Sequence, residues 1–194
     1  MAARVTLRVP DRQQLGAYET ALRGGWSPNT TRDVAPEQLA AIAGDADAFL
    51  AGLLARGGRI RLNDGSEVDK IPDRTRWIFA QDRSGKPFVG SINLRWLEEP
   101  EGRPVEALPP HVLGHVGYSI LPAFAGNGYA TAALAAMIGE AREIGLPRIV
   151  ITCDAGNHAS RRIIERNGGS LVETFTAPLY GPEPRLRFSI ETAP

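Results

Sequence analysis

The chain has 194 residues, 43% of them hydrophobic, with 22 Lys and Arg, 22 Asp and Glu and a single cysteine. This length is sufficient for one stable core, so we expect residues 1–194 to fold as a single domain. One cysteine excludes a disulfide framework and a cysteine-rich zinc site within the chain. Balanced charge provides no general attraction to nucleic acid or an anionic membrane, and the apolar runs are shorter than the ~18 residues of a membrane-spanning helix. The composition predicts a cytoplasmic enzyme or binding protein with no metal, nucleic acid or membrane partner.

The N-terminal half alternates between short strands and amphipathic helices. Residues 5–9 predict a strand, residues 13–22 a helix, and the apolar spacing from Ala35 to Leu53 a second, longer helix. A turn that carries Trp26 separates the two helices. The sequence Asn63-Asp64-Gly65 predicts a hairpin turn after a short strand over 59–62.

Two β-rich runs, 76–80 and 88–96, predict an antiparallel hairpin. The second run alternates apolar residues with the polar trio Ser91, Asn93 and Arg95, which places the trio on one face of the strand. We interpret this face as an ordinary hydrated sheet surface, with the lining of a binding site as the alternative. Residues 97–114, rich in Glu, Pro and Gly, predict a long loop.

The segment with the clearest functional signal is a strand, a glycine-rich turn, a helix and a second strand. It covers a strand over 116–121, the turn over 125–130, a helix to residue 144 and an apolar strand over 148–153. Glycines at 126 and 128 permit close approach of the backbone to a ligand, and the free amides at the helix start favour a phosphate or pyrophosphate.

Three interpretations of this turn stay open on the residues alone: a structural turn, a dinucleotide site and a coenzyme A site. Asp154 stands where a ribose-binding carboxylate would be expected, but Thr131 occupies the third glycine position of a dinucleotide motif. Only 40 residues follow Asp154, too few for a doubly wound sheet. A Walker loop is excluded because no Lys-Ser or Lys-Thr pair closes the glycine-rich run.

The turn resembles the pyrophosphate motif of the GNAT superfamily of acetyl-CoA-dependent N-acetyltransferases. The matching residues are Ala125-Gly126-Asn127-Gly128-Tyr129-Ala130, with Ala125 where the family usually has Gln or Arg. Residues 154–169 resemble the later helix of the family, in which an Asn contacts the pantetheine arm, a role that falls on Asn157. Most of the chain follows the family, including the expected closing strands over 171–175 and 186–190.

The resemblance implies a GNAT α/β (α+β) fold, a mixed and mostly antiparallel sheet with a central pair of parallel strands that splay apart, flanked by helices. It implies acetyl-CoA as co-substrate, with the thioester carbonyl polarised by backbone amides between the two strands. The residues expected to bind it are Tyr118, Ser119, Ile120, Ala125, Gly126, Asn127, Gly128, Tyr129, Ala130, Asn157 and Ser160.

The expected reaction is direct attack of a primary amine on the thioester in a ternary complex. An amine with an ordinary pKa near 10.4 must lose a proton first, and His115 is the first candidate base, with Glu98 and Glu99 as runners-up. The usual tyrosine acid of the family is replaced by Ile164, so Tyr118, Ser160 or water would protonate the thiolate. An acyl-enzyme on Cys153 is the less favoured alternative to a small core residue.

The acceptor is expected to enter over the Trp26 turn and the loop over 177–184, with Asn93 as a further contact. A small-molecule amine and a protein N-terminus are both compatible with the sequence. The exposed closing hairpin is compatible with a homodimer. The alternative function is a non-catalytic protein of the same fold that binds acyl-CoA as a sensor or structural partner.

Overall fold

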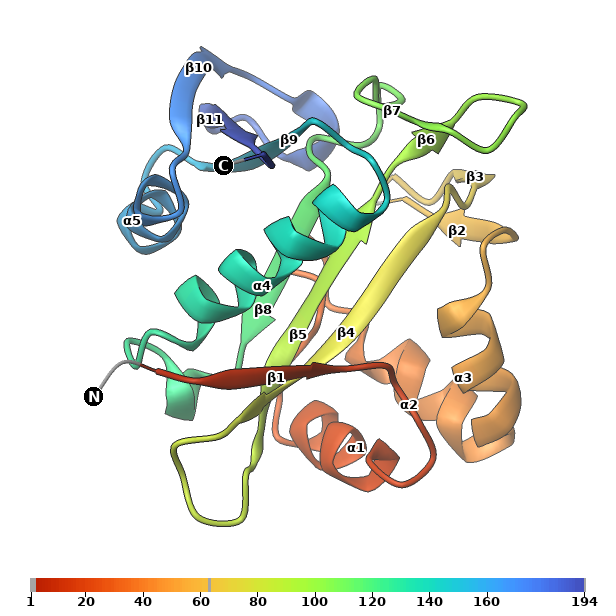
Figure 1. Ribbon diagram of the computed structural model, residues 1–194. Helices are drawn as coiled ribbons and strands as arrows, with labels where there is room; N and C mark the ends of the chain where they lie inside the picture. Colours follow the sequence, from red (N-terminus) through yellow and green to blue (C-terminus); the bar gives the residue numbers. More distant parts are fainter. Residues whose placement is uncertain (1–2, 63, 194) are drawn as a thin grey trace.

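Two antiparallel sheets form the centre of the molecule (Figure 1). The computed structural model describes residues 3–62 and 64–193. The larger sheet has the order β1-β4-β5-β8, formed by Val5–Arg8, Asp73–Ala80, Phe88–Arg95 and Val116–Ile120. The smaller sheet has the order β10-β11-β9, formed by Ser170–Phe175, Arg185–Glu191 and Arg148–Asp154. This arrangement confirms the predicted fold class.

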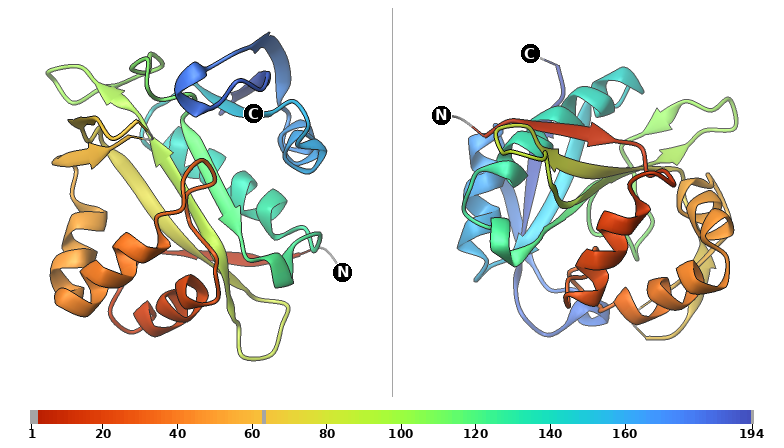
Figure 2. Two further views of the ribbon diagram at one scale, coloured as in Figure 1. Left: turned by 180° about the vertical axis from the view of Figure 1, so that it is seen from behind. Right: turned by 90° about the horizontal axis from the view of Figure 1, so that it is seen from below.

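Helices cover both faces of the larger sheet, as the view from below in Figure 2 shows. On one face lie α1 (Leu15–Arg23), α2 (Ala35–Gly44) and α3 (Ala46–Leu54), which share a core with aromatic side chains of β4 and β5. On the other face lies α4 (Tyr129–Glu143), whose apolar side chains pack on the same two strands from the opposite side. Two separate apolar cores therefore hold the sheet in place.

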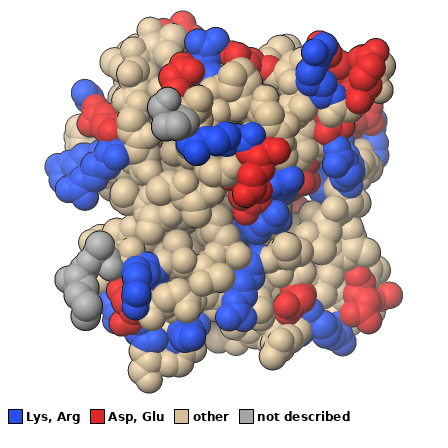
Figure 3. Space-filling view, in the orientation of Figure 1, with Lys and Arg blue, Asp and Glu red and all other residues tan. Residues whose placement is uncertain are grey.

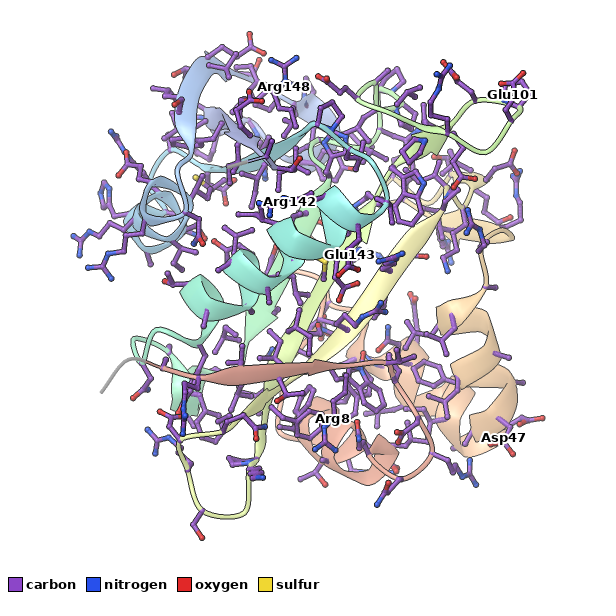
Figure 4. The ribbon with its side chains drawn as sticks, viewed as in Figure 1. Arg8, Asp47, Glu101, Arg142, Glu143 and Arg148 are labelled. Carbon is purple, nitrogen blue, oxygen red and sulfur yellow. The ribbon has the colours of Figure 1, made fainter. Side chains whose placement is uncertain are left out.

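Polar contacts tie α4 to its neighbours. Arg76 of β4 donates to both carboxylate oxygens of Glu140, from Nε at 2.9 Å and from Nη2 at 2.7 Å. Arg142, labelled in Figure 4, donates from its Nε to the carbonyl of Thr192, which follows β11. The remaining helix, α5 (His158–Arg166), contacts α4 and β9. These contacts link the two sheets through α4.

The helix expected from Ala35 to Leu53 is two helices, because Asp45 leaves the helical conformation at φ −156° and ψ 102°. Its side chain accepts hydrogen bonds from the amides of Asp47 and Ala48 at 3.0 and 2.9 Å. Asp is among the preferred N-cap residues. Asp45 therefore marks the start of α3 and does not lie inside one continuous helix.

Short hairpins complete the structure. The segment expected as a long loop contains β6 (Leu97–Glu98) and β7 (Pro104–Val105), an antiparallel pair that the sequence reading missed because each strand has only two residues. The expected hairpin after α3 pairs β2 (Arg59–Arg61) with β3 (Glu67–Asp69). Asn63 of its turn lies outside the described residues. Two 3-10 turns, Pro122–Phe124 and Pro178–Tyr180, lie in the connections after β8 and β10.

Strands β8 and β9 touch at one end and then diverge. The His115 amide donates to the Val150 carbonyl at 2.7 Å, and the Val150 amide donates to Nδ1 of His115 at 2.9 Å. Gly114 permits this crossing, because a Cβ there would lie 3.0 Å from the Val150 carbonyl oxygen. Beyond the contact, the described ladders join β8 to β5 and β9 to β11, so the facing edges of β8 and β9 border an opening.

In the part of the chain that the structure describes, none of the helices combines the length and apolar character needed to cross a membrane. The same residues include no group of three or more His, Cys, Asp or Glu side chains placed to hold a metal ion.

Candidate active site

The opening between β8 and β9 exposes backbone amides. The Leu121 amide donates to the Val89 carbonyl of β5 at 2.9 Å, and amides alternate in direction along a strand. The amides of Tyr118 and Ile120 therefore point away from β5, toward the opening. Two amides in such a position can donate to a carbonyl oxygen that gains negative charge.

The glycine-rich turn begins one helical turn beyond β8. Gly126 and Gly128 have φ of 76° and 83°, a region that glycine adopts far more readily than other residues. Asn127 donates from its side chain to the carbonyls of Phe124 and Ala125 at 3.1 and 3.0 Å, which fixes the turn. Among the described residues, no side chain caps the start of α4, so its first amides are available to an anion. These features fit the pyrophosphate of coenzyme A.

Arg83 brings a positive charge to this turn from the loop between β4 and β5, and the sequence analysis missed it. Its Nε donates to the Tyr129 hydroxyl at 2.8 Å and its Nη2 to Oδ1 of Asn127 at 3.1 Å. Its guanidinium also lies 5.7 Å from the ring centroid of Phe124. Because Arg83 is 44 positions before Asn127 in the chain, no local motif could reveal that it contacts this turn.

The expected pantetheine residues lie at the start of α5. Asn157 caps this helix by accepting a hydrogen bond from the Ser160 amide at 3.0 Å. The Tyr118 side chain of β8 reaches the same region: its buried hydroxyl faces Ser160, without a hydrogen bond of ordinary geometry. Burial raises the pKa of Tyr118 to about 12, so this phenol is protonated at neutral pH.

A cavity of about 770 Å³ opens on the face of the larger sheet that carries α2 and α3. It extends from the segment after Trp26 to Tyr118 and Thr152 at the opening between β8 and β9. In the left view of Figure 2, the chain between α1 and α2 crosses in front of the sheet beside this region. The cavity therefore reaches the site where the two strands separate.

The polar trio of β5 corrects our interpretation of a hydrated sheet surface, because Ser91, Asn93 and Arg95 all line this cavity. Asn93, which we expected to contact the acceptor, therefore lies in the cavity wall. Trp26 is different: it is 5% exposed and packs in the aromatic core, while the residues that follow it line the cavity. The side chain of Ser119, a residue expected to bind acetyl-CoA, does not line the cavity. Its hydroxyl donates to the carbonyl of Ser27 at 2.8 Å.

The geometry does not favour His115 as the catalytic base. The side chain is fully buried, its Nδ1 accepts the hydrogen bond from Val150, and it is not part of the cavity lining. Burial lowers the pKa of His115 to about 4, which opposes its protonation. These observations favour a structural role in holding β8 against β9.

His115 should make stability depend on pH. Its folded-state pKa of about 4 lies below the ordinary 6.5, so the unfolded chain binds more protons between these values, and the free energy of unfolding should fall as the pH drops through this window. The loss amounts to about 3 kcal/mol. Urea unfolding at several pH values would measure it. His115→Asn should flatten the slope, whereas the exposed control His158→Asn should retain it; equal slopes in both variants would contradict the assignment.

The two glutamate candidates also lie away from the cavity. Glu98 accepts a hydrogen bond from Nε1 of Trp96 at 2.8 Å and pairs with Arg56, and Glu99 pairs with Arg103 at 2.5 Å. Neither residue lines the cavity. Both carboxylates thus have local partners of their own.

His111 lines the cavity, although the sequence analysis does not propose it as a catalytic residue. Its Nε2 is buried and has no hydrogen-bond partner among the described residues. Tyr180 donates from its hydroxyl to the His111 carbonyl, which anchors this backbone. An unengaged imidazole in the cavity is the type of side chain that most often accepts a proton in enzymes.

Cys153 of β9 is a core residue. It is 6% exposed and belongs to the apolar cluster beneath α4. Burial raises the pKa of its thiol, so the nucleophilic thiolate is disfavoured.

Together, the splayed strands, the glycine-rich turn at a helix start and the adjoining cavity define an acyl-CoA-dependent transferase. A family model for the acetyltransferase (GNAT) domain matches residues 4–170, and the chain belongs to this family. It is therefore an acyltransferase that transfers an acetyl group from acetyl-CoA to an amine. A search of curated proteins finds no match to the sequence.

Solved structures agree on the fold. RimL, a ribosomal L7/L12 alpha-N-protein acetyltransferase in complex with coenzyme A, has a TM-score of 0.60 and 16% identity, over 96% of this chain and 93% of that one. A GNAT-family acetyltransferase from Bacillus anthracis has a TM-score of 0.61 and 16% identity, over 99% and 97% of the two chains. The microcin C7 self-immunity acetyltransferase MccE, in complex with acetyl-CoA and AMP, has a TM-score of 0.58 and 13% identity, over 96% and 92%.

Proposed function

We propose that the acceptor amine binds in the cavity beneath α2 and α3 and attacks the thioester directly, in a ternary complex, at the opening between β8 and β9. The observation that carries this proposal is that one cavity is lined both by the polar face of β5 and by Tyr118 and Thr152 at the splay. The acceptor and the donor would thus meet from opposite sides of the same opening. Holding both reactants in place supplies a large part of such catalysis.

Acetyl-CoA, when bound, supplies the thioester whose carbonyl carbon bonds to the amine nitrogen and whose sulfur leaves. The amides of Tyr118 and Ile120 donate to the carbonyl oxygen as its charge increases. His111 takes the proton that the amine loses, directly or through one water. The Tyr118 hydroxyl, kept protonated by its raised pKa, donates a proton to the departing sulfur.

The turn over 125–130 holds the pyrophosphate through backbone amides, and Arg83 adds the charge that Ala125 lacks. Asn157 and Ser160 border the pantetheine arm from the start of α5.

Arg83→Ala should weaken acetyl-CoA binding about 10-fold, because one charge-assisted hydrogen bond to phosphate is lost. The loss should be confined to donors that carry the pyrophosphate, so turnover of S-acetylpantetheine should not change. Calorimetry with acetyl-CoA and a thiol-release assay with both donors provide the measurements. Lys86→Gln removes an equal charge from the same loop and serves as the control; equal losses in the two variants would contradict a local role for Arg83.

The acceptor in the proposal is a protein N-terminus or a small-molecule amine. RimL and MccE support both classes, since RimL is an alpha-N-protein acetyltransferase and the structure of MccE holds AMP. The proposed location is the cytoplasm, which suits a lone reduced cysteine. A homodimer is part of the proposal as well, supported by the exposed Leu171 and Val172 on β10, an edge strand, and light scattering would measure it.

The decisive experiment supplies purified protein with acetyl-CoA and a panel of amines, and records thiol release together with the mass of the product. The expected result is an N-acetylated amine formed without an acetylated enzyme intermediate. Tight acetyl-CoA binding with no transfer to any amine would instead favour the alternative, a sensor or structural protein that binds acyl-CoA.

A further inference from the structure

The acceptor cavity is strongly basic, although the chain as a whole carries no net charge. Its lining includes the basic residues Arg32, Arg59, Arg61, Lys70, Arg95 and Arg185, against the acidic residues Glu37 and Asp73. On the opposite side of the molecule, Figure 3 shows blue and red atoms interspersed. The excess of positive charge is therefore a property of the cavity.

Several of these basic side chains already have carboxylate partners. Arg32 pairs with Glu37, Lys70 with Asp73 at 2.8 Å, Arg185 with Asp154 at 2.8 Å and Arg59 with Asp69 at 3.0 Å. Arg95 of β5 is different. Its cross-strand neighbour on β4 is Asp73, but this carboxylate pairs with Lys70. Among the described residues, no carboxylate lies within ion-pair distance of the Arg95 guanidinium.

The environment of Arg95 leaves most of its donors unused. Its Nη2 donates to Oδ1 of Asn93 at 3.3 Å, while its Nε is buried and has no partner among the described residues. A guanidinium has five N–H donors in a planar fork, the geometry that matches a carboxylate or a phosphate. Burial lowers the pKa of Arg95 and the nearby Tyr180 and Asp73 oppose this effect, yet a guanidinium stays charged in proteins.

The neighbouring strand is built to make room for this side chain. Gly117 of β8 pairs with Asn93, and a Cβ at position 117 would lie 2.7 Å from Nη2 of Arg95 and 3.0 Å from Oδ1 of Asn93. The absence of a side chain at Gly117 thus keeps the guanidinium accessible from the cavity. The Arg95 side chain is only partly exposed, and a guanidinium that is withdrawn from water without an ion-pair partner is costly, so this arrangement suits a charge that arrives with the substrate.

We propose that the acceptor amine carries an anionic oxygen group, a carboxylate or a phosphate, which Arg95 binds together with Asn93. This inference rests on the proposed function, since it assigns the acceptor of the same cavity. The Arg95 amide bonds to the His115 carbonyl, whereas Tyr118 pairs with Ile92, so their backbones are three residues, or ~10 Å, apart along the sheet. The acceptor therefore separates its amine from its anion by several bonds, as an acidic peptide does and glycine does not.

The test compares pairs of acceptors that differ only in this charge. The carboxylate arm uses the dipeptide amides Gly-Glu-NH2 and Gly-Gln-NH2, and the phosphate arm uses the dipeptide amides of Gly-phosphoserine and Gly-Ser. We expect the acidic member of at least one pair to have a kcat/KM about 10- to 100-fold higher than its neutral partner. The arm that shows the preference identifies the anion. Equal kcat/KM values within both pairs would overturn the proposal.

The variants assign the preference to Arg95. Arg95→Gln should abolish it and Arg95→Lys should restore it in part, because Lys keeps the charge but not the fork. Gly117→Ala should reduce it as well, since the new methyl group displaces the guanidinium. Acetyl-CoA affinity and the melting temperature report whether each variant is folded. A folded Arg95→Gln variant that keeps the full preference would contradict the assignment.

Binding by itself distinguishes this proposal from the proposed function. If the protein transfers acetyl to no amine, calorimetry of the four acceptors with the coenzyme A-loaded protein still tests whether Arg95 binds an anion. Preferential binding of an acidic member that is lost in Arg95→Gln would support the anion site while the transferase function fails. Turnover of neutral amines without any charge preference would support the function and refute the anion site.

Discussion

A chain with Gly128→Glu is expected to bind acetyl-CoA at least ~100-fold more weakly than the wild type. Gly128 is the residue before α4, with a φ of 83°, and the first amides of the helix lie directly after it. A carboxylate at this position would repel the pyrophosphate and compete for the same amides. Calorimetric titration with acetyl-CoA measures the loss, and no turnover is required.

The control for this substitution is Gly128→Asn. Both new residues bear the strain of a positive φ, but Asn tolerates it better and adds no charge. Asn should keep most of the affinity, and a melting temperature for each variant shows that the fold persists. If Glu and Asn bind acetyl-CoA equally well, the turn is structural and the coenzyme binds elsewhere.

Replacement of His111 by Asn is expected to lower kcat by about 10²- to 10⁴-fold, the usual contribution of a general base. Asn fills a similar position without accepting a proton, so the affinity for acetyl-CoA should not change. An amine with a pKa near 10.4 becomes tenfold more available to attack with each unit of pH, so the residual activity should rise steadily with pH. A pH profile of kcat from the wild type and the variant tests this.

His115→Asn is the matched comparison for that experiment. It should lower stability, because the hydrogen bond from Val150 and the packing at the crossing are disturbed, while the folded fraction keeps its pH profile. If His115→Asn loses activity and changes the pH profile of kcat while His111→Asn keeps full activity, the general base is His115 and not His111. The two variants therefore decide between the base expected from the sequence and the one favoured by the structure.

Much of the coenzyme site could be predicted from the sequence because it is local. The amides proposed to face the pyrophosphate come from the consecutive residues 126–130, and the helix starts at Tyr129, inside the expected turn over 125–130. Asn157 likewise caps the helix that begins immediately after it. The turn over 125–130 and the start of α5 are each one short segment. The conformation of the first depends on its own glycines, and that of the second on its own N-cap residue.

The acceptor side could not be predicted in the same way. The alternation along β5 placed Asn93 and Arg95 on one face, but it could not tell whether water or a cavity covers that face. His115 was the first candidate base from the sequence, yet the crossing with Val150 buries it. His111, four residues earlier, reaches the cavity instead, because the backbone turns between the two.

By itself, the sequence determined most helices and strands, their order and the chemistry of the glycine-rich turn. It could do so because backbone propensity, hydrophobic periodicity and helix capping act between residues a few positions apart. Only the tertiary structure decided which side chains meet across the sheet: Arg83 with the turn over 125–130, Arg95 with Gly117, and His115 with Val150. These contacts join residues up to 46 positions apart. Their geometry follows from strand register and helix packing, which no local pattern contains.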